Sequence, residues 1–219
     1  MTNKCVVVLL GGGHAAGKKS TASLLKEELQ KLQKSNKLNI VKLDLEDYKV
    51  VDSSSCSTKP SRFDFDGVRN YIQANSESED FQTVFIVYGL YALYNKELRN
   101  ISHMRVFIDS DLDTRLIRWI RRDVLQNKVS TLEDILYEYM EKSREEMSEF
   151  IFPTKEYADV VMPRGPEPHA VSLLVDGILP YLSTIDLNSH THTSIPLRPM
   201  EHFNKEKFDG QKGSFYEIN

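Results

Sequence analysis

The chain has 219 residues, enough for one large domain at about 150 residues per domain. Its 28 basic and 32 acidic residues leave a net charge of −4, and 40% of its residues are hydrophobic, which excludes a collagenous, wholly disordered or highly charged chain. A slightly acidic chain lacks the basic surface typical of nucleic-acid binding, so we expect no nucleic-acid partner.

The cysteines and the apolar runs indicate the compartment. Cys5 and Cys56 are too few for a disulfide framework or a four-ligand zinc site. The longest apolar run near the N-terminus, residues 5–10, is far too short for a signal-peptide core or a membrane span. We therefore expect no membrane association and a cytoplasmic protein with reduced thiols, with the nucleus as a second location.

Strands and helices alternate along the chain. Residues 5–10 form a short aliphatic run typical of a strand buried on both faces, and apolar residues at helical spacing predict a helix over residues 17–33. The same two patterns then recur in turn. Strands are predicted at residues 39–45, 83–87, 104–108 and 158–162, and helices at residues 66–74, 111–126, 132–150 and 169–182. This alternation predicts an α/β fold with a parallel sheet and helices on both faces.

Polar segments separate these elements. Residues 50–61 are rich in serine and are predicted to be a surface loop, and residues 75–80 are an acidic linker. From about residue 186 the hydrophobic periodicity ends. We therefore predict one domain over residues 1–185 and an irregular tail over residues 186–219.

A phosphate-binding motif follows the first strand. Residues 12–18, the phosphate loop, read Gly-Gly-His-Ala-Ala-Gly-Lys and fit the pattern G-x-x-x-x-G-K between a predicted strand and helix. Glycines let backbone N–H groups turn toward phosphates, the helix adds its positive end, and the lysine reaches the terminal phosphates. The sheet is thus predicted to be of the P-loop NTPase type, with ATP bound at the loop. The predicted ATP-binding residues here are Gly12, Gly13, His14, Ala15, Ala16, Gly17, Lys18, Lys19 and Ser20.

The motif departs from its usual form after Lys18. The next residue is normally Ser or Thr, whose hydroxyl binds Mg²⁺, but here it is Lys19, and a hydroxyl follows only at Ser20. One residue along a helix turns the side chain by about 100°, so Ser20 does not automatically point to the same place. Either Mg²⁺ is held without the usual hydroxyl, with Ser20 as the candidate ligand, or Lys19 supplies positive charge instead. We expect His14 to be a spacer in the loop and not a base.

Three later segments resemble the uridine–cytidine kinase family. They are Phe107-Ile-Asp-Ser-Asp-Leu-Asp-Thr-Arg-Leu-Ile-Arg118, Thr131-Leu-Glu-Asp-Ile-Leu-Tyr-Glu-Tyr139 and Phe152-Pro-Thr-Lys-Glu-Tyr-Ala-Asp-Val-Val-Met-Pro-Arg-Gly165. The last is a long match without gaps to the family's P-T-K-x-Y-A-D and P-R-G. The resemblance extends from about Val6 to Leu182, and its departures are similar to those of divergent uridine kinases described in yeasts.

The resemblance implies transfer of the γ-phosphoryl group of ATP to the 5′-hydroxyl of uridine or cytidine, with Mg²⁺ as cofactor and a place in pyrimidine salvage. Such transfer requires a carboxylate near the attacking hydroxyl. Glu46 or Asp47 is in register with the family's aspartate, depending on the anchor chosen, and Asp44 is a third candidate. With Lys18, Glu46 and Asp47 are therefore the predicted catalytic residues.

Other roles also follow from the resemblance alone. Asp64 would bind the ribose hydroxyls, and Glu167 lies where the family approaches adenine. Arg118 and Arg122 are predicted to reach the phosphates, whereas other arginines of the same helix are expected to form surface ion pairs with its aspartates. Family members often self-associate, so a homo-oligomer is a further expectation.

Three departures leave alternatives open. Tyr88 stands where the family has a carboxylate, Trp119 where it has a second arginine, and the segment before residue 83 is too short for the family's base-covering hairpin. The sequence therefore allows an active pyrimidine nucleoside kinase, a kinase for another small riboside, or a nucleotide-binding protein that has lost most phosphoryl transfer.

Overall fold

The computed structural model describes residues 5–32, 38–50, 59–76 and 81–182. Most of the predicted loop at 50–61, part of the acidic linker and the predicted tail lie outside these residues. None of the helices in the described segments is long and apolar enough to cross a membrane.

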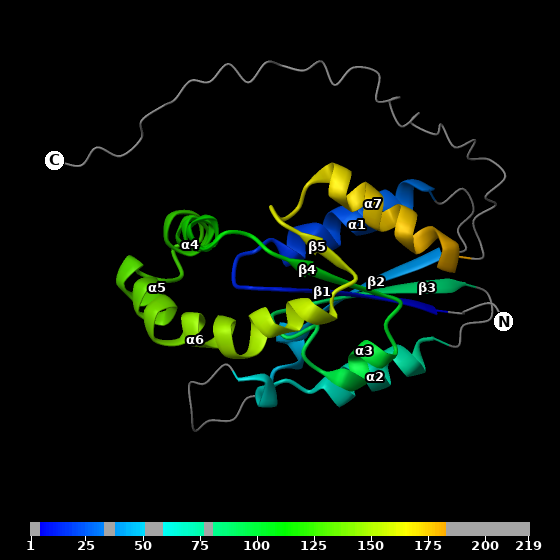
Figure 1. The fold of residues 1–219 in the computed structure, drawn as a ribbon, viewed down its shortest axis with the longest axis horizontal. Helices are drawn as coiled ribbons and strands as arrows, with labels where there is room; N and C mark the ends of the chain where they lie inside the picture. The colour runs from blue at the N-terminus through cyan, green and yellow to red at the C-terminus, as the bar shows by residue number, and fades with distance from the viewer. Residues whose placement is uncertain (1–4, 33–37, 51–58, 77–80, 183–219) are drawn as a thin grey trace, which may run out of the picture. The chain divides into compact units, whose positions relative to one another are not determined.

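Five parallel strands form the central sheet (Figure 1). They are β1 (Cys5–Gly12), β2 (Leu38–Asp44), β3 (Gln82–Tyr88), β4 (Met104–Ile108) and β5 (Val160–Met162). Their order is β2-β3-β1-β4-β5, so β1 is central and pairs with β3 on one side and β4 on the other. In such open sheets ligands bind beyond the carboxyl ends of the strands where the order reverses, and the phosphate loop lies at this point.

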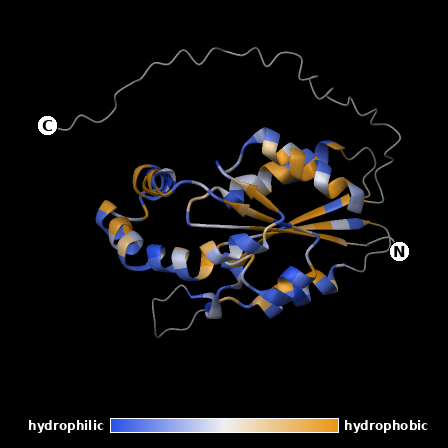
Figure 2. Cartoon of the chain, in the orientation of Figure 1, coloured by the Kyte–Doolittle hydropathy of each residue, from blue (hydrophilic) through white to orange (hydrophobic). Residues whose placement is uncertain are grey.

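Helices cover both faces of the sheet. Alternate residues of β1 point to opposite faces. Val6 and Val8 pack with α1 (Lys18–Leu32) and α7 (Pro168–Ile178), whereas Val7 and Leu9 pack with α2 (Phe65–Ala74) and α3 (Lys96–Asn100). Figure 2 shows hydrophobic strands between helices that carry both hydrophobic and hydrophilic residues. The predicted parallel sheet with helices on both faces is therefore confirmed.

A third group of helices lies beyond the carboxyl ends of the strands (Figure 1). It consists of α4 (Leu112–Ile120), α5 (Leu132–Glu138) and α6 (Arg144–Glu146). Wider π-helical turns follow α4 at Arg121–Gln126 and flank α6 at Tyr139–Ser143 and Met147–Ile151. Such turns are frequent at functional sites. The predicted helices at 111–126 and 132–150 are confirmed in extent, and Thr131 caps the second through a reciprocal pair of hydrogen bonds with Asp134.

The strand predictions agree with the structure to within two residues. The largest differences, of two residues, are at the end of β1, which reaches Gly12 and not residue 10, and at the start of β5, which begins at Val160 and not at residue 158. Asp159 precedes the strand because its carboxylate binds Arg105 through the backbone N–H and the guanidinium. The short helix α3 was not predicted, since its five residues are too few for a periodic pattern.

Candidate active site

The phosphate loop links the end of β1 to the start of α1. Gly12 and Gly17 have positive φ angles of 139° and 104°, which a glycine adopts without strain. A Cβ atom at Gly12 would also lie 2.4 Å from the carbonyl oxygen of Ile108. The strand–loop–helix context required for a phosphate loop is thus present.

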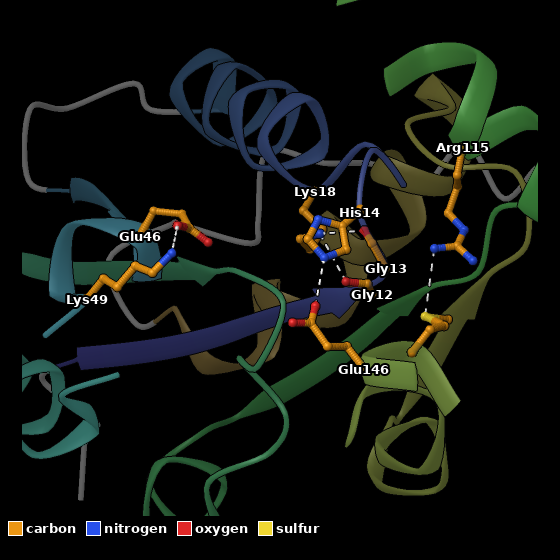
Figure 3. A network of polar contacts seen from close by, with 9 residues as sticks. Gly12, Gly13, His14, Lys18, Glu46, Lys49, Arg115 and Glu146 are labelled. Carbon is orange, nitrogen blue, oxygen red and sulfur yellow. Dashed lines mark hydrogen bonds and ion pairs between the residues drawn. The ribbon is translucent and has the colours of Figure 1, made fainter. Parts of the chain in front are cut away.

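Lys18 is folded onto the loop. Its Nζ donates to the carbonyl oxygens of Gly12 (2.9 Å) and Gly13 (2.6 Å), as Figure 3 shows. Burial and, after it, the nearby guanidinium of Arg115 lower the pKa of Lys18 to about 7, although the charges of Glu46 and Asp44 act in the opposite direction. The protonation of the Lys18 amine therefore depends on its burial and on the charges of the neighbouring arginine and carboxylates.

A cavity of about 750 Å³ opens beside the loop. Six of the predicted ATP-binding residues line it: His14, Ala15, Gly17, Lys18, Lys19 and Ser20. The side chains of Lys19 and Ser20 are exposed, so both can reach a ligand there. Thr21 cannot replace the missing hydroxyl, because it is fully buried and its Oγ1 donates to the carbonyl oxygen of Gly17.

The carboxylates after β2 divide into two groups. Asp44 and Glu46 line the cavity, whereas Asp47 is exposed and is not among its lining residues. Asp44 accepts a hydrogen bond from the backbone N–H of Glu46 at 3.1 Å and is paired with Tyr88 on the neighbouring strand. Glu46 lies 3.9 Å from Lys49. The geometry therefore favours Glu46 over Asp47 as the predicted catalytic carboxylate and places Asp44 beside it.

The two arginines predicted to reach phosphates both line the cavity. Arg118 Nη1 contacts the carbonyl oxygen of Ala16 (3.4 Å), and Nη2 contacts that of Arg164 (3.4 Å), so this side chain joins the phosphate loop to the loop after β5. Arg122 instead forms two hydrogen bonds with its neighbour Asp123, at 2.6 and 2.8 Å. Arg122 can thus bind phosphate only in competition with, or in addition to, this carboxylate.

Arg115 departs from the expectation of surface ion pairs. Its side chain is buried behind the phosphate loop, where Nε donates to the carbonyl oxygen of Ser110 and Nη1 lies 3.7 Å from Met147 Sδ. Among the described residues no carboxylate lies within ion-pair distance of it. Arg115 therefore adds a fixed positive charge close to Gly13, and the surface ion pair on this helix is formed instead by Arg122, which was expected to reach phosphate.

Two other predicted residues lie away from the lining of this cavity. Asp64 caps α2, with its Oδ1 accepting from the backbone N–H of Gly67 at 2.8 Å. Glu167 precedes α7, is exposed, and lies 4.0 Å from Arg164. The roles predicted for them, ribose and adenine binding, stay predictions.

His14 is not the spacer that the sequence suggested. Its ring stacks on Trp119, with centroids 4.8 Å apart and planes 7° apart, and its Nε2 lies 3.1 Å from Glu146 Oε2. Glu146 and Trp119 are both buried. Sequence reasoning missed Glu146, because nothing in the pattern around it indicates that α6 reaches the loop.

The segment that carries the strongest resemblance has a structural role. Lys155 binds Asp109 at 2.7 Å, and Asp159 binds Arg105, so both side chains fix the approach to β5 against β4. These contacts hold Pro163 to Gly165 beside the phosphate loop. A Cβ atom at Gly165, where φ is 88°, would lie 2.9 Å from the carbonyl oxygen of Ala16.

The side-chain oxygen atoms around the cavity are of the kind that binds Mg²⁺, which prefers carboxylate, hydroxyl and phosphate oxygens as ligands. Asp44, Glu46 and Ser20 are the residues on its wall that would hold the ion. The described residues contain no cluster of three or more His, Cys, Asp or Glu side chains that would bind a metal alone. If Mg²⁺ binds here, phosphate oxygens of the nucleotide would supply further ligands.

Comparison with known proteins identifies the family. Residues 68–170 match the model of the phosphoribulokinase / uridine kinase family. The chain is 30% identical to the "Putative uridine kinase DAS2" of Saccharomyces cerevisiae over 99% of its length and 97% of the relative. It is also 30% identical to the uridine kinase of Vibrio cholerae, over 74% of this chain and 89% of that one.

A solved structure supports the fold independently. The "putative fructose transport system kinase" of Silicibacter sp. TM1040 superposes with a TM-score of 0.52 over 72% of this chain and 89% of its own, at 14% identity. This likeness concerns the fold alone. The near full-length match to the yeast relative, together with the family model, shows that the chain belongs to the phosphoribulokinase / uridine kinase family of kinases.

Proposed function

We propose that the protein transfers the γ-phosphoryl group of ATP to the 5′-hydroxyl of a pyrimidine nucleoside, uridine or cytidine, as a step of pyrimidine salvage. The observation that carries this proposal is that one cavity contains both Lys18 and the carboxylates Asp44 and Glu46. Phosphoryl transfer needs a cationic cradle for ATP and a carboxylate at the acceptor within reach of each other. The names of the yeast and Vibrio relatives support the nucleoside as acceptor.

In this proposal the acceptor hydroxyl lies beside Glu46. A new bond forms between the 5′-oxygen and the γ-phosphorus, and the bond from phosphorus to the β,γ-bridging oxygen breaks. The hydroxyl proton passes to the Glu46 carboxylate, and ADP leaves with the electron pair of the broken bond. Lys18 and Arg118 neutralise charge on the phosphate oxygens, and Mg²⁺ supplies further neutralisation when bound.

Product analysis with a panel of nucleosides tests the proposal. Purified full-length protein is incubated with ATP, Mg²⁺ or Mn²⁺, and uridine, cytidine, adenosine, guanosine or nicotinamide riboside, and the monophosphate and ADP are quantified by chromatography. We expect UMP or CMP with an equal amount of ADP from the wild type, and loss of both from Lys18→Met. A preference for nicotinamide riboside would assign a different acceptor. Nucleotide binding without product would contradict the kinase proposal.

A further inference from the structure

His14 is the one residue between Gly12 and Gly17 that is neither glycine nor alanine. A glycine-rich loop has many accessible backbone conformations, and ordering it opposes ligand binding. Contacts that fix the loop before the ligand arrives therefore increase affinity. Arg118 contacts the loop at the backbone of Ala16, and His14 is the side chain within this segment through which neighbouring helices can also hold it.

Two helices contact His14. Trp119 of α4 stacks on the imidazole, with ring centroids 4.8 Å apart. Glu146 of α6 lies 3.1 Å from His14 Nε2 (Figure 3). Trp119 is 6% exposed and Glu146 is 7% exposed, so both contacts lie in a medium that strengthens electrostatic interactions. Among the described residues, His14 Nε2 is the one basic nitrogen within ion-pair distance of Glu146, so loss of this contact would remove a polar partner from a buried side chain.

The contacts continue to the wall of the cavity. Trp119 lines the same cavity as the ion pair between Arg122 and Asp123. The contacts that hold His14 therefore extend to the wall of the nucleotide cavity. We call Glu146, His14 and Trp119 the loop bridge.

We propose that Trp119 and Glu146 are positioning residues for nucleotide binding, which act by holding His14 and with it the phosphate loop in its binding conformation. This inference rests on the proposed function, because it concerns the same ATP site. Trp119 thereby gives a role to a position where the resemblance leads one to expect arginine. An arginine at this position would contact phosphate directly. Trp119 instead supports the loop that contacts phosphate.

The composition of the chain supplies a specific probe. Trp119 is its single tryptophan, and the indole both stacks on the loop and lines the cavity. Emission from an indole depends on what contacts the ring, so emission excited where the ten tyrosines do not absorb reports on the surroundings of Trp119. We expect ATP to change the emission of the wild type with a saturable dependence on concentration.

Variants of the two helices test the inference. We expect Glu146→Gln and Trp119→Leu to weaken ATP binding by about tenfold, and Trp119→Phe, which keeps an aromatic ring on His14, to recover most of the affinity. The matched control is Glu145→Gln, which removes a carboxylate from the adjacent exposed position and should bind ATP as the wild type does. Titration calorimetry well below each melting temperature gives the dissociation constants, including those of the variants without tryptophan.

The outcomes separate this inference from the proposed function. If Glu146→Gln and Trp119→Leu lower the melting temperature but bind ATP with wild-type affinity, the bridge is only structural and the inference is wrong. The kinase proposal would then be unaffected. If the wild type fails to bind ATP, both the proposed function and this inference are overturned.

Discussion

Asp44 and Tyr88 are paired at the ends of the neighbouring strands β2 and β3, and both side chains line the cavity. Burial, together with the charge of Asp44, raises the pKa of Tyr88 to about 12, so the hydroxyl stays protonated at neutral pH. Tyrosine cannot supply the carboxylate that the resemblance implies at this position. The neighbouring strand supplies a carboxylate to the cavity instead, at Asp44.

This arrangement leads to a prediction for the carboxylates after β2. We expect Glu46→Gln to lower kcat by about 10²–10⁴-fold with a smaller effect on KM, because a base at the acceptor hydroxyl acts mainly in the transition state. Asp47→Asn, one residue away and outside the cavity lining, is the matched control and should retain near wild-type turnover. Steady-state kinetics with the best nucleoside measure both. Wild-type turnover by Glu46→Gln together with loss of turnover in Asp44→Asn would transfer the role to Asp44.

Lys18 gives a prediction about pH. Its pKa is about 7 in the free protein because its amine is buried, and phosphate oxygens favour the charged form, so bound ATP raises this pKa. Below pH 7 the amine is already protonated and ATP affinity does not depend on it. Above pH 7 binding requires proton uptake, so affinity falls as pH rises, by up to about tenfold per pH unit. Calorimetry between about pH 6 and 9, in buffers of different ionisation enthalpy, measures affinity and proton uptake together.

The control for this experiment is Lys18→Arg. A guanidinium stays charged throughout this range, so the variant should lose the proton uptake due to the side chain and keep only that of ATP itself. Equal proton uptake by the wild type and Lys18→Arg would show that Lys18 is already charged in the free protein.

The sequence predicts the sheet well because both signals involved are local. Buried strands such as β1 and β3 are continuous apolar runs. The phosphate loop is a contiguous motif whose glycines permit the backbone angles that the loop requires. Lys18, Lys19 and Ser20 therefore line the cavity as predicted. The strand pattern of β2 is also local, but it does not determine which carboxylate of the short turn after the strand faces the cavity. Glu46 lines the cavity and the adjacent Asp47 does not, and the sequence could not distinguish them.

The contacts missed from the sequence join residues far apart in the chain. Glu146 is 132 residues from His14, and neither position has a pattern that indicates its partner. Arg115 and Arg122 occur in one helix with similar neighbours, yet the first is buried behind the phosphate loop and the second is exposed. The difference arises from the packing of α4 against the loop, which a single sequence does not encode in any local pattern.

The ion pair between Arg105 and Asp159 leads to a prediction about stability. Hydrogen bonds from Arg105 hold the pKa of Asp159 below its usual value, so the pair stabilises the fold above about pH 4 and this contribution is lost as pH falls through the folded-state pKa. Because both side chains are partly exposed, we expect Asp159→Asn to lower the free energy of unfolding by about 0.5–1 kcal/mol at neutral pH. Urea denaturation measures this, with the exposed Asp176→Asn as control. If Asp159→Asn is still less stable than the wild type by the same free energy of unfolding below about pH 3, the electrostatic explanation is wrong.

The substitution Lys19→Ser tests how the site manages without the usual hydroxyl after Lys18. Lys19 is exposed and lines the cavity beside Ser20, so its ammonium group adds positive charge where the motif normally provides a metal ligand. Removing this cation should favour Mg²⁺, and the new hydroxyl should help to bind it, so we expect Lys19→Ser to increase Mg²⁺-dependent turnover by about tenfold. Lys19→Ala separates the two effects, since it removes the charge without adding a ligand. Turnover is measured across a range of Mg²⁺ concentrations, and the gain should be greatest where Mg²⁺ is limiting. If Lys19→Ser and Lys19→Ala both lose turnover at saturating Mg²⁺, then Lys19 itself neutralises phosphate charge and is a functional replacement for part of the metal's role.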